Sequence, residues 1–158
     1  MLPNPTPNVV LHVNNIVTQF KTSEGTVHAV NGVSFDVREG ELLGVVGESG
    51  CGKTVTMMSL VKLLPMPPGE FVHGSAIFED NDLIQSDMRM LQSVRGGSIG
   101  FIFQDPMTSL NPVLTVGYQL TEALRLHKQV SKTAARQRAL ELLDLVGIPM
   151  AKERLNDY

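Results

Sequence analysis

Residues 47 to 54 read Gly47-Glu48-Ser49-Gly50-Cys51-Gly52-Lys53-Thr54 and match the pattern G-x-x-x-x-G-K-[ST] in full. The almost wholly apolar run Glu41–Val46 precedes this loop, and Thr54–Leu64 follows it with apolar residues at helical spacing. The short apolar run predicts a strand covered on both faces, as in a parallel sheet. Strand, glycine-rich loop and helix in this order are the context in which the pattern binds phosphate groups.

The residue types of this loop suit a nucleotide. Backbone N–H groups from Gly50 through Thr54 are expected to turn inward around phosphate oxygens, and the following helix adds the partial positive charge of its N-terminus. The ammonium of Lys53 suits the β- and γ-phosphates, and the hydroxyl of Thr54 suits Mg²⁺. We therefore predict a site for ATP and Mg²⁺ made of Gly47, Glu48, Ser49, Gly50, Cys51, Gly52, Lys53 and Thr54.

The rest of the chain changes character along its length. Residues 1–8 carry three prolines and predict a disordered tail. The patterns that follow predict strands at Val9–Phe20, Val33–Val37, Ser75–Glu79 and Ile99–Phe103, and helices at Asp87–Val94, Val116–Lys128 and Ser131–Val146. The strand Ile99–Phe103 is expected to be buried. The fold class is therefore α/β at first and helical towards the end.

Composition excludes several classes of protein. The chain has 158 residues, 42% of them hydrophobic, with 13 Lys and Arg against 16 Asp and Glu, a net charge of −3. This balance argues against a protein held on nucleic acid by bulk positive charge. The single Cys51 forbids an intramolecular disulfide and fits a reducing compartment. No apolar run reaches the roughly 20 residues of a membrane-spanning helix, and the first residues lack the features of a secretory signal.

A second segment narrows the class of nucleotide-binding protein. Ile99–Pro112 reads I-G-F-I-F-Q-D-P-M-T-S-L-N-P, which predicts a strand that delivers Gln104 into a polar loop. With Gly47–Thr54, it resembles the ATP-binding-cassette ATPases, and both segments are similar to the oligopeptide and dipeptide importer branch, to which the nickel and glutathione importers are close. The resemblance, which runs from about Val9 onward, implies that Gln104 meets Mg²⁺ and the attacking water. It also implies that Phe20 stacks on adenine.

Other parts of that family's pattern do not occur in the sequence. Its ATPases carry an apolar strand ending in Asp-Glu, but Ala76–Asp80 has the acids reversed and Phe101–Asp105 ends in Gln-Asp. The Ser-Gly-Gly signature and the switch histidine are absent too. His12, His28, His73 and His127 lack metal-ligand spacing and are interpreted as surface or structural residues. The simplest interpretation is an N-terminal fragment that binds MgATP and does not hydrolyse it alone, with Lys53 and Gln104 as its catalytic residues in the intact parent.

The resemblance sets the expected organisation and partners. We expect a truncated P-loop NTPase core at residues 9–112, with antiparallel strands at its start and both the phosphate loop and the glutamine loop. The start of a helical subdomain is expected at 113–158. The parent would pair with a second ATPase subunit and with transmembrane permease subunits, at the cytoplasmic face of the cell membrane. Apolar surface left uncovered predicts self-association of the fragment.

Two alternatives stay open. One is a non-catalytic nucleotide-binding or docking module. The other is a GTPase or small-molecule kinase, although the chain has no Asn-Lys-x-Asp stretch for guanine and no arginine-rich lid. The charges on Ser131–Val146, among them Lys132 and Arg136, are interpreted as a solvated helix face.

Overall fold

The structure is a computed structural model that describes residues 9–105, 109–128 and 130–158. These residues form two compact units, Met1–Leu91 and Gln92–Tyr158. The predicted disordered tail at residues 1–8 lies outside the described residues. None of the helices in the described ranges is long and apolar enough to cross a membrane.

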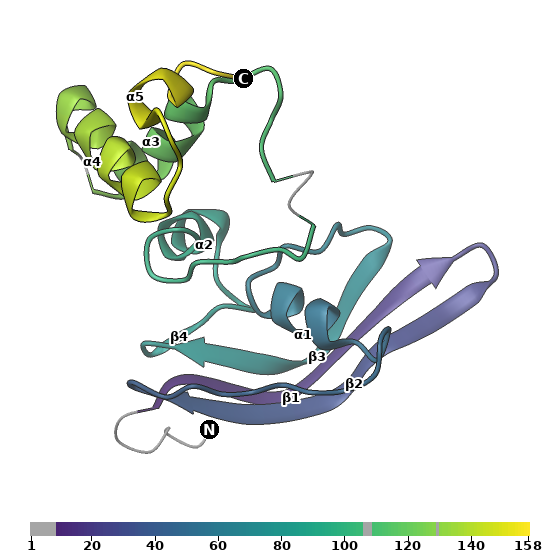
Figure 1. Cartoon of the computed structure of the whole chain (residues 1–158). Helices are drawn as coiled ribbons and strands as arrows, with labels where there is room; N and C mark the ends of the chain where they lie inside the picture. Colours follow the sequence, from purple (N-terminus) through teal and green to yellow (C-terminus); the bar gives the residue numbers. More distant parts are fainter. Residues whose placement is uncertain (1–8, 106–108, 129) are drawn as a thin grey trace. The chain divides into compact units, whose positions relative to one another are not determined.

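The first unit is built on a four-stranded antiparallel sheet with the order β2-β1-β3-β4 (Figure 1). Its strands are β1 (Val9–Thr22), β2 (Gly25–Arg38), β3 (Gly69–Phe78) and β4 (Asn81–Asp82). A tight turn joins β1 to β2, where Thr22 pairs with Gly25. Apolar side chains that alternate along the strands bury one face, on which Val13, Ile16 and Ala76 lie. The predicted strands at 9–20, 33–37 and 75–79 are thus confirmed, although each is longer or shifted.

One helix packs on this sheet. Helix α1 (Lys53–Leu60) contacts β1 and β2, and Leu60, Val61 and Leu64 are buried at and beyond its end. The predicted helix at 54–64 is therefore confirmed in position but ends four residues early. Val61 is its C-cap residue, and prolines follow from residue 65.

The second unit is helical after an irregular start. Helix α2 (Met88–Val94) leads into it, and α3 (Val116–His127), α4 (Lys132–Leu145) and α5 (Ala151–Arg154) follow. The hydroxyls of Thr115 and Ser131 cap α3 and α4 by accepting hydrogen bonds from Tyr118 N and Ala134 N. Side chains from α4 and α5 form a small core, whose buried members are Ala139, Leu143, Ala151 and Leu155. The three predicted helices are confirmed to within a residue.

Two predicted buried strands are wrong. Glu41–Val46 contains no strand, and the side chains of Leu42 and Val46 are 97% and 92% exposed. Ile99–Phe103 likewise forms no strand beyond an isolated bridge between Arg95 and Ile99. The physical reason is the same for both: a strand exists only through its ladder of hydrogen bonds, and the described residues place no partner strand beside either run. The described sheet is accordingly antiparallel and not parallel.

Candidate nucleotide-binding site

The glycine-rich loop joins the sheet to α1 in the first unit. Gly52 is the N-cap residue of α1 and has φ of 96°, in the left-handed region. A Cβ atom at this position would lie 2.4 Å from the carbonyl oxygen of Ala29 on β2. Only glycine therefore fits, because both the backbone angle and the space beside β2 exclude a side chain. This contact fixes the end of the loop against the sheet.

The loop presents unused hydrogen-bond donors. Within the described part of the chain, no hydrogen bond uses the backbone N–H groups of Gly50, Gly52, Lys53 or Thr54. The first N–H groups of a helix have no partner inside the helix, and their dipoles favour a negative charge in front of them. Unused N–H groups at a helix N-terminus suit phosphate oxygens, which are acceptors and carry negative charge. The residues present therefore fit a nucleotide phosphate.

The ammonium of Lys53 lies over the same loop. Its Nζ donates to the carbonyl oxygens of Gly47 and Glu48, both at 2.7 Å, and lies 3.5 Å from the Sγ of Cys51. The chain thus folds Lys53 back onto the loop it follows, where its charge is close to the unused N–H groups. Cys51 is exposed, and its thiol lies beside the ammonium that we expect to bind phosphate.

A buried pair of hydroxyls holds α1 in place. Thr18 on β1 and Ser59 on α1 have no exposed surface, and their hydroxyl oxygens are 3.0 Å apart. Ser59 donates its hydrogen to the carbonyl of Val55 at 2.7 Å, so Thr18 donates to Ser59. Sequence reasoning missed this pair. The available signal was a hydroxyl residue on the apolar face of each predicted element, Thr18 in the strand and Ser59 in the helix. Buried hydroxyls need hydrogen-bond partners, so two such residues can be expected to pair.

The predicted metal ligands are neutral oxygens and lie in different units. Thr54 is exposed in the first turn of α1, close in sequence to the unused N–H groups. Gln104 is an exposed residue of the second unit, outside any helix or strand. The described residues hold no group of three or more His, Cys, Asp or Glu side chains that could bind a metal ion. A magnesium ion here would therefore depend on phosphate oxygens for much of its coordination.

Phe20 lies on the part of the sheet that the loop reaches. It pairs with Val27 on β2 and with Gly69 on β3, and it is half-buried. Gly52 meets β2 at Ala29, two residues from Val27 along the same strand. The structure thus brings Phe20 and the end of the loop to the same stretch of β2. Its proposed contact with adenine stays a prediction.

A charged cluster borders Phe20. The carboxylate of Glu70 accepts hydrogen bonds from Gln19 Nε2 at 2.7 Å and pairs with Lys21 Nζ at 2.8 Å. These two contacts, that with Lys21 first, hold the pKa of the Glu70 carboxyl below its usual range. They join β1 to β3 on either side of Phe20.

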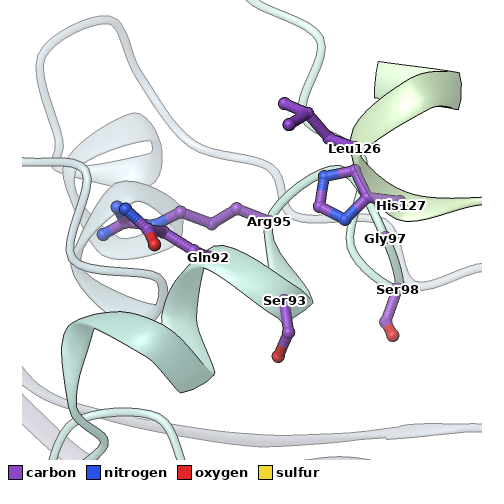
Figure 2. A pocket seen from close by; sticks show the side chains of 7 residues that line it. All are labelled: Gln92, Ser93, Arg95, Gly97, Ser98, Leu126 and His127. Atoms are coloured by element: carbon purple, nitrogen blue, oxygen red, sulfur yellow. The ribbon is translucent and has the colours of Figure 1, made fainter. Parts of the chain in front are cut away.

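The second unit has an open depression of about 750 Å³ near the end of α3. Figure 2 shows the side chains of Gln92 and Arg95 on one side of it, turned away from His127, which lies beside Gly97 and Ser98. The polar groups do not converge on one point, so this depression is not built like a binding site. The interpretation of His127 as a surface or structural residue stays a prediction.

Comparison with known proteins identifies relatives that are ATP-binding proteins, in agreement with the nucleotide site expected at the glycine-rich loop. The family model described as "ABC transporter" matches residues 30–158. The oligopeptide transport ATP-binding protein OppD of Bacillus subtilis is 52% identical over 94% of this chain and 42% of its own length. The dipeptide transport ATP-binding protein DppD of the same organism is 51% identical over 94% of this chain and 44% of its own length. The chain therefore spans about half the length of the curated relatives it matches.

A solved structure shows the same fold. The dimeric ATP-binding cassette MJ0796 bound to ADP and phosphate superposes with a TM-score of 0.77 at 24% identity, over 93% of this chain and 60% of that one. This likeness confirms the predicted P-loop fold class with its N-terminal antiparallel strands. The predicted resemblance to the oligopeptide and dipeptide branch is confirmed by the matches above. The chain belongs to the ABC transporter family.

Proposed function

We propose that this chain is the nucleotide-binding front part of the energy-coupling subunit of a peptide importer. The observation that carries the proposal is the row of unused N–H groups at Gly50, Gly52, Lys53 and Thr54, with the Lys53 ammonium beside it. The names of its relatives, which are oligopeptide and dipeptide transport ATP-binding proteins, support the importer class.

The chain's residues would divide the work of holding MgATP. The loop N–H groups and Lys53 bind the β- and γ-phosphates, and the hydroxyl of Thr54 faces the ion. When bound there, Mg²⁺ would supply positive charge against the phosphate oxygens. Phe20 offers a flat apolar face to the adenine, and Gln104 is proposed to meet Mg²⁺ and the attacking water.

Hydrolysis needs residues that this sequence does not contain. A carboxylate that polarises the attacking water normally follows an apolar strand, and no Asp-Glu pair does so here. We propose that the chain binds MgATP without turnover and that the intact parent hydrolyses it. Residues 9–112 form the nucleotide-binding core in this proposal, and 113–158 begin the helical subdomain.

The partners follow from the same assignment. We propose a second ATP-binding subunit and transmembrane permease subunits as partners of the parent, at the cytoplasmic face of the membrane. The solved cbiO1 of Clostridium perfringens is part of the ABC transporter complex cbiONQ, and MJ0796 is a dimer. The exposed side chains of Leu42, Val46 and Ile102 support self-association of this chain, because burying such apolar surface between chains is favourable.

Titration calorimetry of MgATP into the whole chain tests the proposal, with phosphate release measured in parallel. Lys53→Ala is expected to weaken binding about 10- to 100-fold, because it removes charge-assisted hydrogen bonds to the phosphates. Lys152→Ala, an exposed lysine on α5, is the matched control and should bind as the unmutated chain does.

Binding that Lys53→Ala weakens, without phosphate release, supports the proposal. Equal binding by both variants would contradict the role of the loop, and steady phosphate release by the purified chain would contradict its catalytic incompleteness. The thiol of Cys51 gives an independent readout, because bound MgATP should slow its alkylation.

A further inference from the structure

A depression of about 340 Å³ lies between α3 and α4 in the second unit. Three of its lining residues are cationic: Arg125 from α3, and Lys132 and Arg136 from α4. Gly117, Tyr118 and Thr121 complete the lining among the described residues, and none of the six is acidic. A chain with a net charge of −3 thus gathers three positive side chains at one hollow.

The helix pair explains how these side chains meet. Lys132 and Arg136 are four residues apart and so lie on the same side of α4. Helix α3 contributes the single cation Arg125, one turn after Thr121. The neighbouring face of α4 is buried at Ala135 and Ala139, which sets its rotation. Figure 1 shows α3 and α4 packed side by side.

The three cations of the hollow have few hydrogen-bond acceptors among the described residues. Arg136 Nη2 donates to Asn156 Oδ1 at 3.2 Å, an amide that carries no charge. Arg125 and Lys132 have no hydrogen bond or ion pair within the described ranges. Thr121 donates its hydroxyl hydrogen to the carbonyl of Gly117 at 2.7 Å. The hydroxyl of Tyr118 is therefore the neutral side-chain donor that stays available in this lining.

Other arginines of the same unit differ. Arg138 pairs with Glu141 at 2.9 Å, and Arg154 pairs with Asp157 at 2.9 Å. Arg138 and Arg154 thus each have a carboxylate partner. The described residues give no carboxylate partner to the three cations of the hollow, which repel one another. A bound anion would remove that repulsion.

We propose that this hollow is a binding site for a phosphate group. Two guanidinium groups offer paired N–H donors that match phosphate oxygens, and Lys132 adds a point charge with three donors. Three cations match the charge of a phosphate dianion better than that of a single carboxylate. Lys132 and Arg136 are exposed, as their interpretation as parts of a solvated helix face expects. The proposed site lies in a different unit from the glycine-rich loop.

The phosphate has two possible sources, free phosphate in solution or the headgroup of an anionic lipid. The test titrates the whole chain with inorganic phosphate at constant ionic strength, followed by amide chemical shifts in α3 and α4. These shifts report the hollow separately from Gly47–Thr54. A second arm measures sedimentation of the chain with vesicles of phosphatidylglycerol and phosphatidylcholine.

The variant Arg125→Gln with Lys132→Gln removes two cations that make no hydrogen bond in the described structure. The variant Arg138→Gln with Lys152→Gln changes the net charge equally at residues outside the hollow. We expect the first to weaken phosphate binding about three- to tenfold and the second to leave it within twofold. Circular dichroism and a melting curve confirm that each variant is folded.

Each outcome decides the proposal. Phosphate shifts in α3 and α4 that only the Arg125–Lys132 variant weakens support it, and vesicle binding with the same dependence assigns the phosphate to a lipid headgroup. Equal weakening by both double variants would overturn it, because the effect would then be general charge screening. Three exposed cations are expected to bind phosphate with a dissociation constant no weaker than roughly tens of millimolar. Absence of shifts up to that concentration, together with absence of vesicle binding, would overturn the proposal too.

Discussion

The strands of the sheet and the two apolar runs at residues 41–46 and 99–103 have similar sequences but different structures. Both are rich in Val, Leu, Ile and Phe, and both predict strands. In the sheet, Ile16 is fully buried, whereas Leu42 in the run before the phosphate loop is 97% exposed. Ile102 in the run before Gln104 is also 97% exposed. Local sequence is therefore not what separates them.

The difference lies in where the partner strand is found. Strand β1 meets β2 through a short turn, and β3 returns to the other edge of β1 and pairs with β4. Every antiparallel pairing of the described sheet is therefore made within residues 9–82. A parallel pairing needs a crossover connection and a partner distant in sequence. The runs 41–46 and 99–103 have the composition of such strands, and no strand of the described residues lies beside them.

The largest effect is expected from truncating side chains in the two regions. Ile16→Ala should lower the free energy of unfolding by about 4 kcal/mol, since it leaves a cavity in the core. Leu42→Ala should change it by less than about 0.5 kcal/mol, because its side chain makes almost no contact. Urea denaturation followed by circular dichroism measures both. A loss above about 2 kcal/mol for Leu42→Ala would mean that residues 41–46 are packed.

A second effect concerns association of the exposed runs. Leu42→Lys combined with Ile102→Lys should weaken self-association about 100-fold, which corresponds to about 2.8 kcal/mol. The reason is that two exposed apolar side chains are no longer there to be buried between chains. Light scattering over a range of concentrations measures this. The control with the same change in net charge is Glu39→Gln with Glu122→Gln, two exposed positions outside both runs. A monodisperse monomer for the unmutated chain at high concentration would argue against the proposed association.

A third effect tests the contact between the end of the glycine-rich loop and strand β2. Gly52→Ala should cost about 2 kcal/mol and weaken nucleotide binding, because φ is 96° and the new methyl group meets Ala29 O. Gly50→Ala also has positive φ, of 81°, but nothing lies within 4 Å of its Cβ, so its cost should be about 1 kcal/mol. Thermal unfolding of both variants measures the difference. Equal costs would show that the loop does not contact β2.

Sequence reasoning reached the parts of this structure that depend on local patterns. The helix after the glycine-rich loop follows from its motif, and the capped helices α3 and α4 follow from apolar spacing. It failed for 41–46 and 99–103, because an apolar run predicts burial but does not supply the strand that buries it. It also missed the Thr18–Ser59 pair and the three cations between α3 and α4, since residues distant in sequence meet there only after packing.

The smallest effect is a dependence of sheet stability on pH. The pKa of Glu70 is lowered in the folded chain, chiefly by its hydrogen bond to Lys21. Its contribution to stability is therefore present above the pKa of the unfolded state and lost as pH falls through the folded pKa. Glu70→Gln should reduce the loss of stability between about pH 5 and about pH 3. Lys21→Met should reduce it too, as urea midpoints at both pH values would show; an unchanged pH dependence in both variants would contradict this role.

Native-state hydrogen exchange read by NMR tests the contrast between the paired and unpaired runs most directly. We predict slow exchange at the backbone amides of Val13, Ile16 and Val30, which lie in paired strands. The amides of Leu42–Val46 and of Ile102–Phe103 should exchange at rates close to those of an unfolded chain. Slow exchange at these apolar runs, comparable to that of the sheet, would contradict the claim that they have no partner strand.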